Sequence, residues 1–309
     1  MAVDRHTYAS ADDVRDYLAG TTYSSGWTSD GLTLRRVLES SSRRIDIYCG
    51  GGTFGPKTET RSFDIGTGTL IQSPQYLSVG GYGTNDIATT NAYTGNIPLD
   101  AWLLSATTVT SYKQTARTES ETLTEGSSND YFLIPYNRSP KTILKLNQDT
   151  AKGFYTGQQT LTIAGSWGYT SDTEQITDLN GAVSSTTATT VAVTSATNLG
   201  PVQTILVGSE QMYITSISSN NLTVERGVNG TTAATHSDED GVNIYLYPTI
   251  IVQACLDLAK VTFRDRDLGV TQTIGSGEQG ITRSSQEAVD ILKTLDGYRS
   301  VGLSDSVNF

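Results

Sequence analysis

The sequence contains one glycine pattern that could bind a nucleotide. Residues 275–280 read Gly-Ser-Gly-Glu-Gln-Gly, which is the glycine spacing of dinucleotide-binding turns. In those sites the glycines open a helix whose N-terminal amides bind the pyrophosphate. Here the next expected helix begins later, at Ser284, and no second parallel strand follows. Residues 50–52 are three glycines without the Gly-Lys-Ser/Thr ending of a phosphate loop. We therefore expect no nucleotide or other cofactor.

Metal binding and acid–base catalysis have equally weak signals. The two histidines, His6 and His236, lie in an N-terminal segment and a polar loop, and no Cys/His cluster surrounds either. Residues 238–241 read Asp-Glu-Asp-Gly, without the alternate-residue spacing of a calcium loop. No Gly-x-Ser-x-Gly elbow occurs. A glycosidase stays open at this level, because paired carboxylates meet in space rather than in sequence. We expect no metal and no catalysed reaction.

The only dense basic group lies on a long helix that we expect to follow Asp30. Its members are Arg35, Arg36, Arg43 and Arg44. The group has three readings: a solvated or subunit-facing surface, salt bridges between neighbouring subunits, or contact with DNA. Because Arg36 and Arg43 share the face opposite the apolar stripe, we predict these two as subunit-interface residues.

Composition narrows the class of protein. The 309 residues carry a formal net charge of −11, which disfavours non-specific binding to nucleic acid or to anionic membranes. Thr, Ser and Gly are abundant and 17% of residues are charged, as in β-rich assembly proteins. Two cysteines, Cys49 and Cys255, predict buried, reduced thiols in a cytoplasmic product. We expect neither a signal peptide nor a membrane span, because no apolar run reaches the ~20 residues that a span needs.

Hydrophobic periodicity predicts helices at both ends of the chain and strands between them. Ser10 caps a first helix over residues 11–19, and the long second helix ends at Cys49 before the glycines. An apolar helix is expected over 249–264, and a last helix begins with capping-box spacing at Ser284. The expected strands between residues 61 and 166 are 61–65, 76–79, 101–112, 131–134, 142–146 and 159–164.

A second β-rich segment covers residues 171–247. Its expected strands are 189–193, 203–207, 211–217, 222–225 and 242–247, with turns at Gly208-Ser209 and Ser219-Asn220. Short strands with tight turns suggest a small barrel or sandwich. The segment holds eight acidic residues and one basic residue, a net charge of −7. We therefore expect a solvent-facing module that does not grip DNA.

Several motifs resemble the head–tail connector (adaptor) proteins of tailed bacteriophages. Residues 45–50 read Ile-Asp-x-Tyr-Cys-Gly and residues 61–64 read Arg-x-Phe-Asp. Residues 131–135 read Tyr-Phe-Leu-Ile-Pro, and 165–169 read Gly-Ser-Trp-Gly-Tyr. In that family a Pro-x-x-Ile-x-x-Ala helix follows the last motif almost at once, whereas here it begins at Pro248. The resemblance therefore covers the core and not the segment 171–247.

The resemblance implies a fold and a function. The fold is α+β, with terminal helices flanking an antiparallel β core made of residues 1–170 and 248–309, and a barrel-like insertion at 171–247. The function is that of a structural virion protein, assembled in the host cytoplasm and located at the head–tail interface. About twelve copies would form a closed ring, a dodecamer, beneath the portal protein. The ring would extend the channel for double-stranded DNA and offer a platform for the next connector or tail protein.

The resemblance also implies a docking site. In the family the C-terminal helix and tail dock on the portal, which by position assigns this role to Leu292, Leu295, Tyr298 and Arg299. The alternative is that this helix packs on its own domain, because its one apolar face must be buried somewhere. Two rival functions remain: a receptor- or glycan-binding tail module, suggested by the Thr/Ser-rich insertion, and a tail enzyme with paired carboxylates in a cleft.

Overall fold

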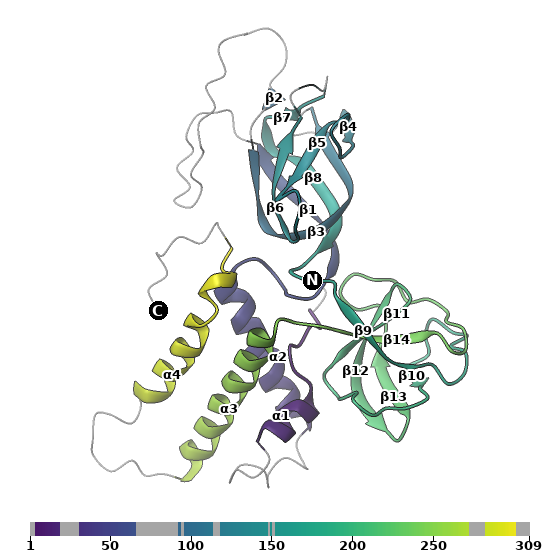
Figure 1. The fold of residues 1–309 in the computed structure, drawn as a ribbon, viewed down its shortest axis with the longest axis vertical. Helices are drawn as coiled ribbons and strands as arrows, with labels where there is room; N and C mark the ends of the chain where they lie inside the picture. Colours follow the sequence, from purple (N-terminus) through teal and green to yellow (C-terminus); the bar gives the residue numbers. More distant parts are fainter. Residues whose placement is uncertain are drawn as a thin grey trace. The chain divides into compact units, whose positions relative to one another are not determined.

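The computed structural model describes residues 4–18, 31–65, 92–93, 96–113, 118–147, 149, 152–271 and 282–300. The chain is α+β with antiparallel sheets and divides into two compact units (Figure 1). The first unit contains Met1–Cys49 and Ser171–Arg299, and the second contains Gly50–Thr170. The expected core of residues 1–170 and 248–309 is thus divided between the two units at Cys49–Gly50, and the expected insertion, 171–247, belongs to the unit that holds the helices.

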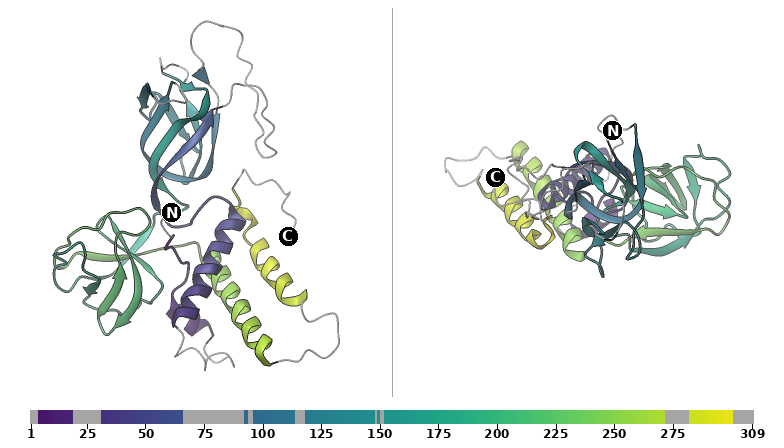
Figure 2. Two further views of the ribbon diagram at one scale, coloured as in Figure 1. Left: turned by 180° about the vertical axis from the view of Figure 1, so that it is seen from behind. Right: turned by 90° about the horizontal axis from the view of Figure 1, so that it is seen from above.

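The first unit is built on three long helices, which the views of Figures 1 and 2 show close together. The helices of the unit are α1 (Ala11–Tyr17), α2 (Gly31–Cys49), α3 (Thr249–Thr271), α4 (Thr282–Lys293) and the 3-10 turn η2 (Asp296–Tyr298). Ser10 and Asp13 form the expected capping box of α1. Helix α2 packs on α3, which also packs on α4. Buried Leu38 and Ile45 come from α2, and Ile251 and Leu258 from α3, as the stripes predict.

Residues 171–247 form a six-stranded antiparallel sheet within this unit. Its strands are β9 (Thr173–Asp178), β10 (Thr190–Ala192), β11 (Thr204–Val207), β12 (Glu210–Ser218), β13 (Asn221–Glu225) and β14 (Gly241–Tyr245). The spatial order is β10-β13-β12-β11-β14-β9. Of the two forms that we expected, a barrel or a sandwich, the described strands do not form a closed barrel, because the two edge strands meet only at the bridge between Leu179 and Val193. The two hairpin turns are confirmed, with positive φ angles at Gly208 and Ser219.

The second unit is a separate antiparallel sheet. Its strands are β1 (Lys57–Ile65), β3 (Asn96–Tyr112), β4 (Ser120–Leu123), β5 (Tyr131–Ile134), β6 (Lys141–Leu146) and β8 (Gly157–Trp167), and a small ribbon pairs β2 (Ala92–Tyr93) with β7 (Phe154–Tyr155). The main path runs β1-β8-β3-β6-β5, with β4 beside β3. The expected strand at 76–79 lies outside the described residues.

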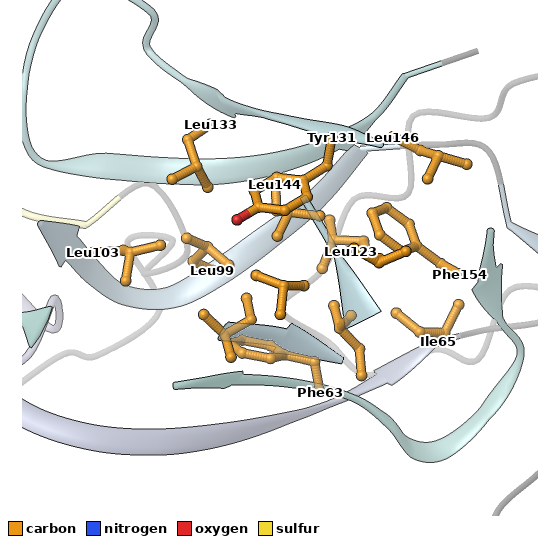
Figure 3. Close-up of a cluster of buried hydrophobic side chains, with 14 of the residues drawn as sticks. Phe63, Ile65, Leu99, Leu103, Leu123, Tyr131, Leu133, Leu144, Leu146 and Phe154 are labelled. Atoms are coloured by element: carbon orange, nitrogen blue, oxygen red, sulfur yellow. The ribbon is translucent and has the colours of Figure 1, made fainter. Parts of the chain in front are cut away.

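One face of this sheet carries the core of the second unit. Figure 3 shows Phe63, Leu103, Leu144 and Phe154 pointing toward one another from different strands. Leu103, Leu144 and Phe154 are completely buried. Burial alternates along β1 with the expected period of two: Phe63 and Ile65 are buried, while the residue between them, Asp64, is exposed.

The motif at residues 165–169 has a packing explanation. A Cβ atom at Gly165 would lie 2.2 Å from the carbonyl oxygen of Ser105 on the adjacent strand β3. Gly168 has a φ of +156°, and a Cβ there would lie 2.4 Å from the carbonyl oxygen of Gly55. Glycine is required at both positions because backbone approaches backbone where β8 ends.

Substitution of Gly165 tests this explanation. We expect Gly165→Ala to lower the free energy of unfolding by about 1–3 kcal/mol, because the backbone of β3 must move to admit a methyl group. Chemical denaturation of the full chain measures the change. Gly297→Ala is the matched control, since no atom lies within 4 Å of its added Cβ. Equal stability of the two variants would contradict the close approach.

Candidate functional site

The N-terminal segment binds the inserted sheet to the helices of the first unit. We call residues 4–10 the N-terminal strap. It has no regular structure, yet His6 and Tyr8 are only 1% and 2% exposed. Its contacts with the sheet include the Thr204 hydroxyl, which donates to the Arg5 carbonyl over 2.5 Å. On the other side, the Tyr8 amide donates to the Ser42 hydroxyl of α2 over 3.2 Å. We had expected a solvent-facing module. The strap instead attaches the sheet of residues 171–247 to α2.

Five side chains form a charged joint between the strap, α2 and the inserted sheet. They are Arg5, Arg35, Glu39, Tyr213 and Glu225. Arg5 donates to Glu225 over 2.8 Å and to Glu39 over 3.0 Å. Arg35 donates to Glu39 over 3.1 Å and to Glu225 over 3.0 Å. The Tyr213 hydroxyl donates to Glu39 over 3.0 Å, and both guanidinium groups lie about 5 Å from the Tyr213 ring centre, at 5.2 and 5.0 Å. Both glutamates thus bridge two arginines, which fixes the sheet against α2.

A buried carboxyl group lies next to this joint. Asp46 on α2 accepts a hydrogen bond from the Tyr8 hydroxyl and pairs with Arg43 over 3.0 Å. Burial raises the pKa of Asp46 to about 7, although the charge of Arg43 and the bond from Tyr8 act in the opposite direction. Arg43 also pairs with Asp4 over 2.9 Å and donates to the His6 carbonyl. The group holds the strap against α2.

The raised pKa of Asp46 makes stability depend on pH. The folded chain binds a proton that the unfolded chain releases near pH 4, so stability falls as pH rises from about 4 to about 7. One such proton gives a slope of at most about 1.4 kcal/mol per pH unit. We expect Asp46→Asn to flatten this slope, measured by denaturant unfolding between pH 4.5 and 7.5. The control Asp290→Asn, which alters an exposed carboxylate, should leave the slope unchanged. An unchanged slope in Asp46→Asn would contradict the assignment.

A second buried carboxylate, Glu210 on β12, binds several groups of the loop that follows β13 in the inserted sheet. Arg226 donates to its two oxygens over 2.6 and 2.7 Å. The backbone amides of Gly227 and Ala234 donate to it over 3.0 and 2.9 Å, and His236 Nε2 lies 2.8 Å away. Burial alone would raise the pKa of Glu210, but the bonds from Arg226, Ala234 and His236 hold it at about 2. We call this group the Glu210 clamp. It pins the loop after β13 to β12.

The residues predicted to dock on a portal lie at the end of the first unit. Leu295 is completely buried, so it packs within its own unit, which is the alternative role considered for this helix. Leu292, Tyr298 and Arg299 are half-buried. The Arg299 guanidinium lies 5.5 Å from the ring centre of Tyr48 on α2. Three of the four residues thus keep part of their surface exposed, and their docking role stays a prediction.

The four arginines of α2 have different surroundings. Arg35 belongs to the charged joint, and Arg43 is committed to Asp4 and Asp46 of its own chain. Arg36 and Arg44 are exposed, and neither forms an ion pair with any residue that the structure describes. Arg43 is therefore used within its own chain, and the subunit-interface role of Arg36 and Arg43 stays a prediction. The sequence could not reveal the contact of Arg43 with the strap, because the strap is distant in sequence.

The cysteines and His236, which were the remaining candidates for chemistry, are buried or bonded within the fold. Burial raises the pKa of Cys49 to about 12 and that of Cys255 to about 11, so both free thiols stay protonated. His236 belongs to the Glu210 clamp. Among the described residues, no group of three or more His, Cys, Asp or Glu side chains could hold a metal ion. The glycine pattern at 275–280 lies outside the described residues.

The comparisons with known proteins add no identification. No family model matches the chain, and comparison with curated proteins and with solved structures found no match either. Within the described part of the chain, no helix combines the length and the apolar character needed to cross a bilayer. The case for a function therefore rests on the motifs of the sequence and on the geometry described above.

Proposed function

We propose that the protein is a head–tail connector adaptor of a tailed bacteriophage. In this proposal, copies of the chain form a ring beneath the portal, extend the DNA channel and present a platform to the next connector or tail protein. The work is mechanical: it depends on shape, packing between subunits and surface charge rather than on a catalysed step.

The observation that supports this proposal best is the construction of the first unit. Helices from the two ends of the sequence, α2 and α3, pack together, and the inserted sheet is fixed to them by the strap and the charged joint. These contacts hold the helices and the inserted sheet in fixed positions relative to one another. A subunit of a closed ring needs such fixed surfaces, because it contacts a neighbour on each side. The motifs that resemble the connectors also occupy regular elements: β5, the end of β8 and the start of α3.

The perturbed side chains support a mechanical role over a catalytic one. Asp46 and Glu210 have the most informative pKa shifts among the described carboxylates, and each is explained by contacts that hold one segment to another. Perturbed pKa values can also mark catalytic sites, in which case the group faces a cleft. Here the Glu210 side chain is 0% exposed and the Asp46 side chain 11% exposed, and both are paired with arginine.

Co-expression with the portal protein of the same genome tests the proposal. The complex is weighed by native mass spectrometry and imaged end-on. We expect a second ring on the portal with the full chain and none with a chain that lacks residues 284–309. Because that truncation removes buried Ala288 and Leu295, a second variant, Leu292→Ala/Arg299→Ala, keeps α4 intact. Gln286→Ala/Lys293→Ala changes exposed positions of the same helix and is the matched control.

The outcomes separate the function from the docking residues. Binding by the full chain and the control, with loss in both altered chains, supports both claims. Binding by every chain means that docking uses another surface, and only the residue assignment is wrong. Failure of the full chain to bind the portal, while it stays folded, contradicts the adaptor proposal. Glycan binding by the Thr/Ser-rich inserted sheet is then the next function to test.

A further inference from the structure

Helix α2 presents an exposed stripe on the side opposite its buried face. The stripe consists of Arg36, Ser40, Arg44 and Ile47, which recur at the spacing of one helical face. Ile47 is 71% exposed, more than any other large apolar side chain in the described part of the chain. We call these four residues the α2 stripe. A single exposed isoleucine is common on protein surfaces, so the two arginines beside it decide which partner the stripe fits.

The arginines of the stripe have no partner among the residues that the structure describes. Arg36 and Arg44 form no ion pair or hydrogen bond with the residues that the structure describes. Their neighbours on the same helix behave differently, because Arg35 and Arg43 each pair with two carboxylates of the first unit. Within the described part of the chain, the α2 stripe therefore has two unpaired guanidinium groups beside an apolar side chain.

A complementary surface lies elsewhere on the same unit. Glu174 and Asp178 belong to β9, an edge strand of the inserted sheet. Asp238 and Glu239 lie beside the end of β9, where the Leu179 amide donates to the Asp240 carbonyl over 2.9 Å. We call Glu174, Asp178, Asp238 and Glu239 the acidic edge. None of the four carboxylates forms an ion pair within the described residues, and Glu174, Asp238 and Glu239 are exposed.

The two surfaces match in length as well as in charge. Eight residues of helix separate Arg36 from Arg44, which is about 12 Å at 1.5 Å per residue. Four residues of strand separate Glu174 from Asp178, which is about 13 Å at the rise of a β-strand. Two arginines are a poor basis for DNA binding in a chain with a net charge of −11. An acidic surface of matching length is a better partner.

We infer that the α2 stripe of one copy docks on the acidic edge of a second copy of this chain. The inference rests on the proposed ring, since it names the contact between its subunits. Two different surfaces of one chain make a heterologous contact, which can propagate around a closed ring. Exposed ion pairs are weak and screened by salt, so they add little affinity and mainly fix how the two surfaces align. Burial of Ile47 in the contact adds apolar area.

Charge reversal tests the contact without a portal. One variant carries Arg36→Glu/Arg44→Glu and the other Glu174→Lys/Asp178→Lys. Mass photometry and sedimentation at low salt measure self-association. We expect the unaltered chain to associate and each variant alone to lose association at least tenfold. An equimolar mixture should regain it, because each reversed surface then meets an opposite charge on the other variant. The mixed ring must alternate, so its copy number must be even.

A charge-matched variant is the control for the charge-reversal experiment. Arg138→Glu/Lys293→Glu changes the net charge as much as the α2 variant does, at exposed positions outside both surfaces, and should associate like the unaltered chain. Circular dichroism checks that every variant is folded. Association by either variant alone, failure of the mixture, or a monomeric unaltered chain overturns the inference. Portal binding by an unaltered chain that is monomeric in solution would leave the proposed function standing and remove only this contact.

Discussion

Replacement of Glu210 by glutamine is expected to destabilise the first unit by about 3–5 kcal/mol at neutral pH. The substitution leaves the Arg226 guanidinium buried, with a side chain only 6% exposed, and without its counter-charge. The new amide keeps one acceptor oxygen, but it places an NH2 group, which only donates, where the second carboxylate oxygen accepted from Arg226 and from the Ala234 amide. Denaturant unfolding of the full chain gives the energy. Hydrogen exchange at the Gly227 and Ala234 amides shows whether the loop after β13 opens.

Two further measurements separate charge from packing in the Glu210 clamp. The double variant Glu210→Met/Arg226→Met removes both charges and should be less destabilised than the sum of the single changes. The pKa of Glu210 near 2 lies below the ordinary value of 4.5, so the clamp stabilises fully above about pH 4.5 and is lost as pH falls toward 2. A loss below about 1 kcal/mol in Glu210→Gln would mean that the clamp is not an essential part of the fold.

Replacement of Trp167 by alanine should lower the stability of the second unit by about 3–5 kcal/mol. The ring is 2% exposed, and its Nε1 donates to the Glu59 carbonyl over 3.1 Å. It stacks on Phe63 with 6.1 Å between ring centres, and the Arg61 guanidinium lies 4.9 Å from its centre. Trp167→Phe keeps most of the apolar volume and should lose less. Hydrogen exchange along β1 and β8 measures the effect on this unit, because two units need not unfold in one transition.

The Trp167 result bears on the resemblance itself. If the tryptophan of the motif at 165–169 is a core residue, Trp167→Ala destabilises the sheet and portal binding falls only as far as folding does. Retained stability with lost portal binding would instead make the motif a contact surface. The first result is the one that the buried position of the ring supports.

Local structure was predictable from the sequence because its signals are local. The capping box at Ser10, the end of α2 at Cys49 and the hairpin turn at Gly208 each depend on residues a few positions apart. Strands β1 and β5 end where the expected strands end, and β3 begins five residues before its prediction. Helix α3 extends seven residues beyond its predicted end at residue 264. Boundaries of this kind depend on tertiary packing, which overrides propensity.

The tertiary pairings had no signal in a single sequence. Arg5 and Glu225 are 220 residues apart, and nothing in the spacing of either indicates the other. The strap reads as an ordinary polar terminus, although its side chains are among the most buried of the first unit. The acidic composition of residues 171–247 suggested a free module, yet Glu210 and Glu225 are used inside the unit. Composition counts charges and does not show which of them are already paired.

The pairing of α2 with α3 also has a consequence for biosynthesis. Some two hundred residues separate the two helices, so α2 leaves the ribosome long before α3 exists. The second unit, Gly50–Thr170, is translated in the interval and can fold as a domain while Leu38 and Ile45 of α2 still lack their partner. Such distant contacts form slowly, since loop closure must precede them. Nascent chains of this protein should therefore recruit chaperones at α2 until α3 emerges.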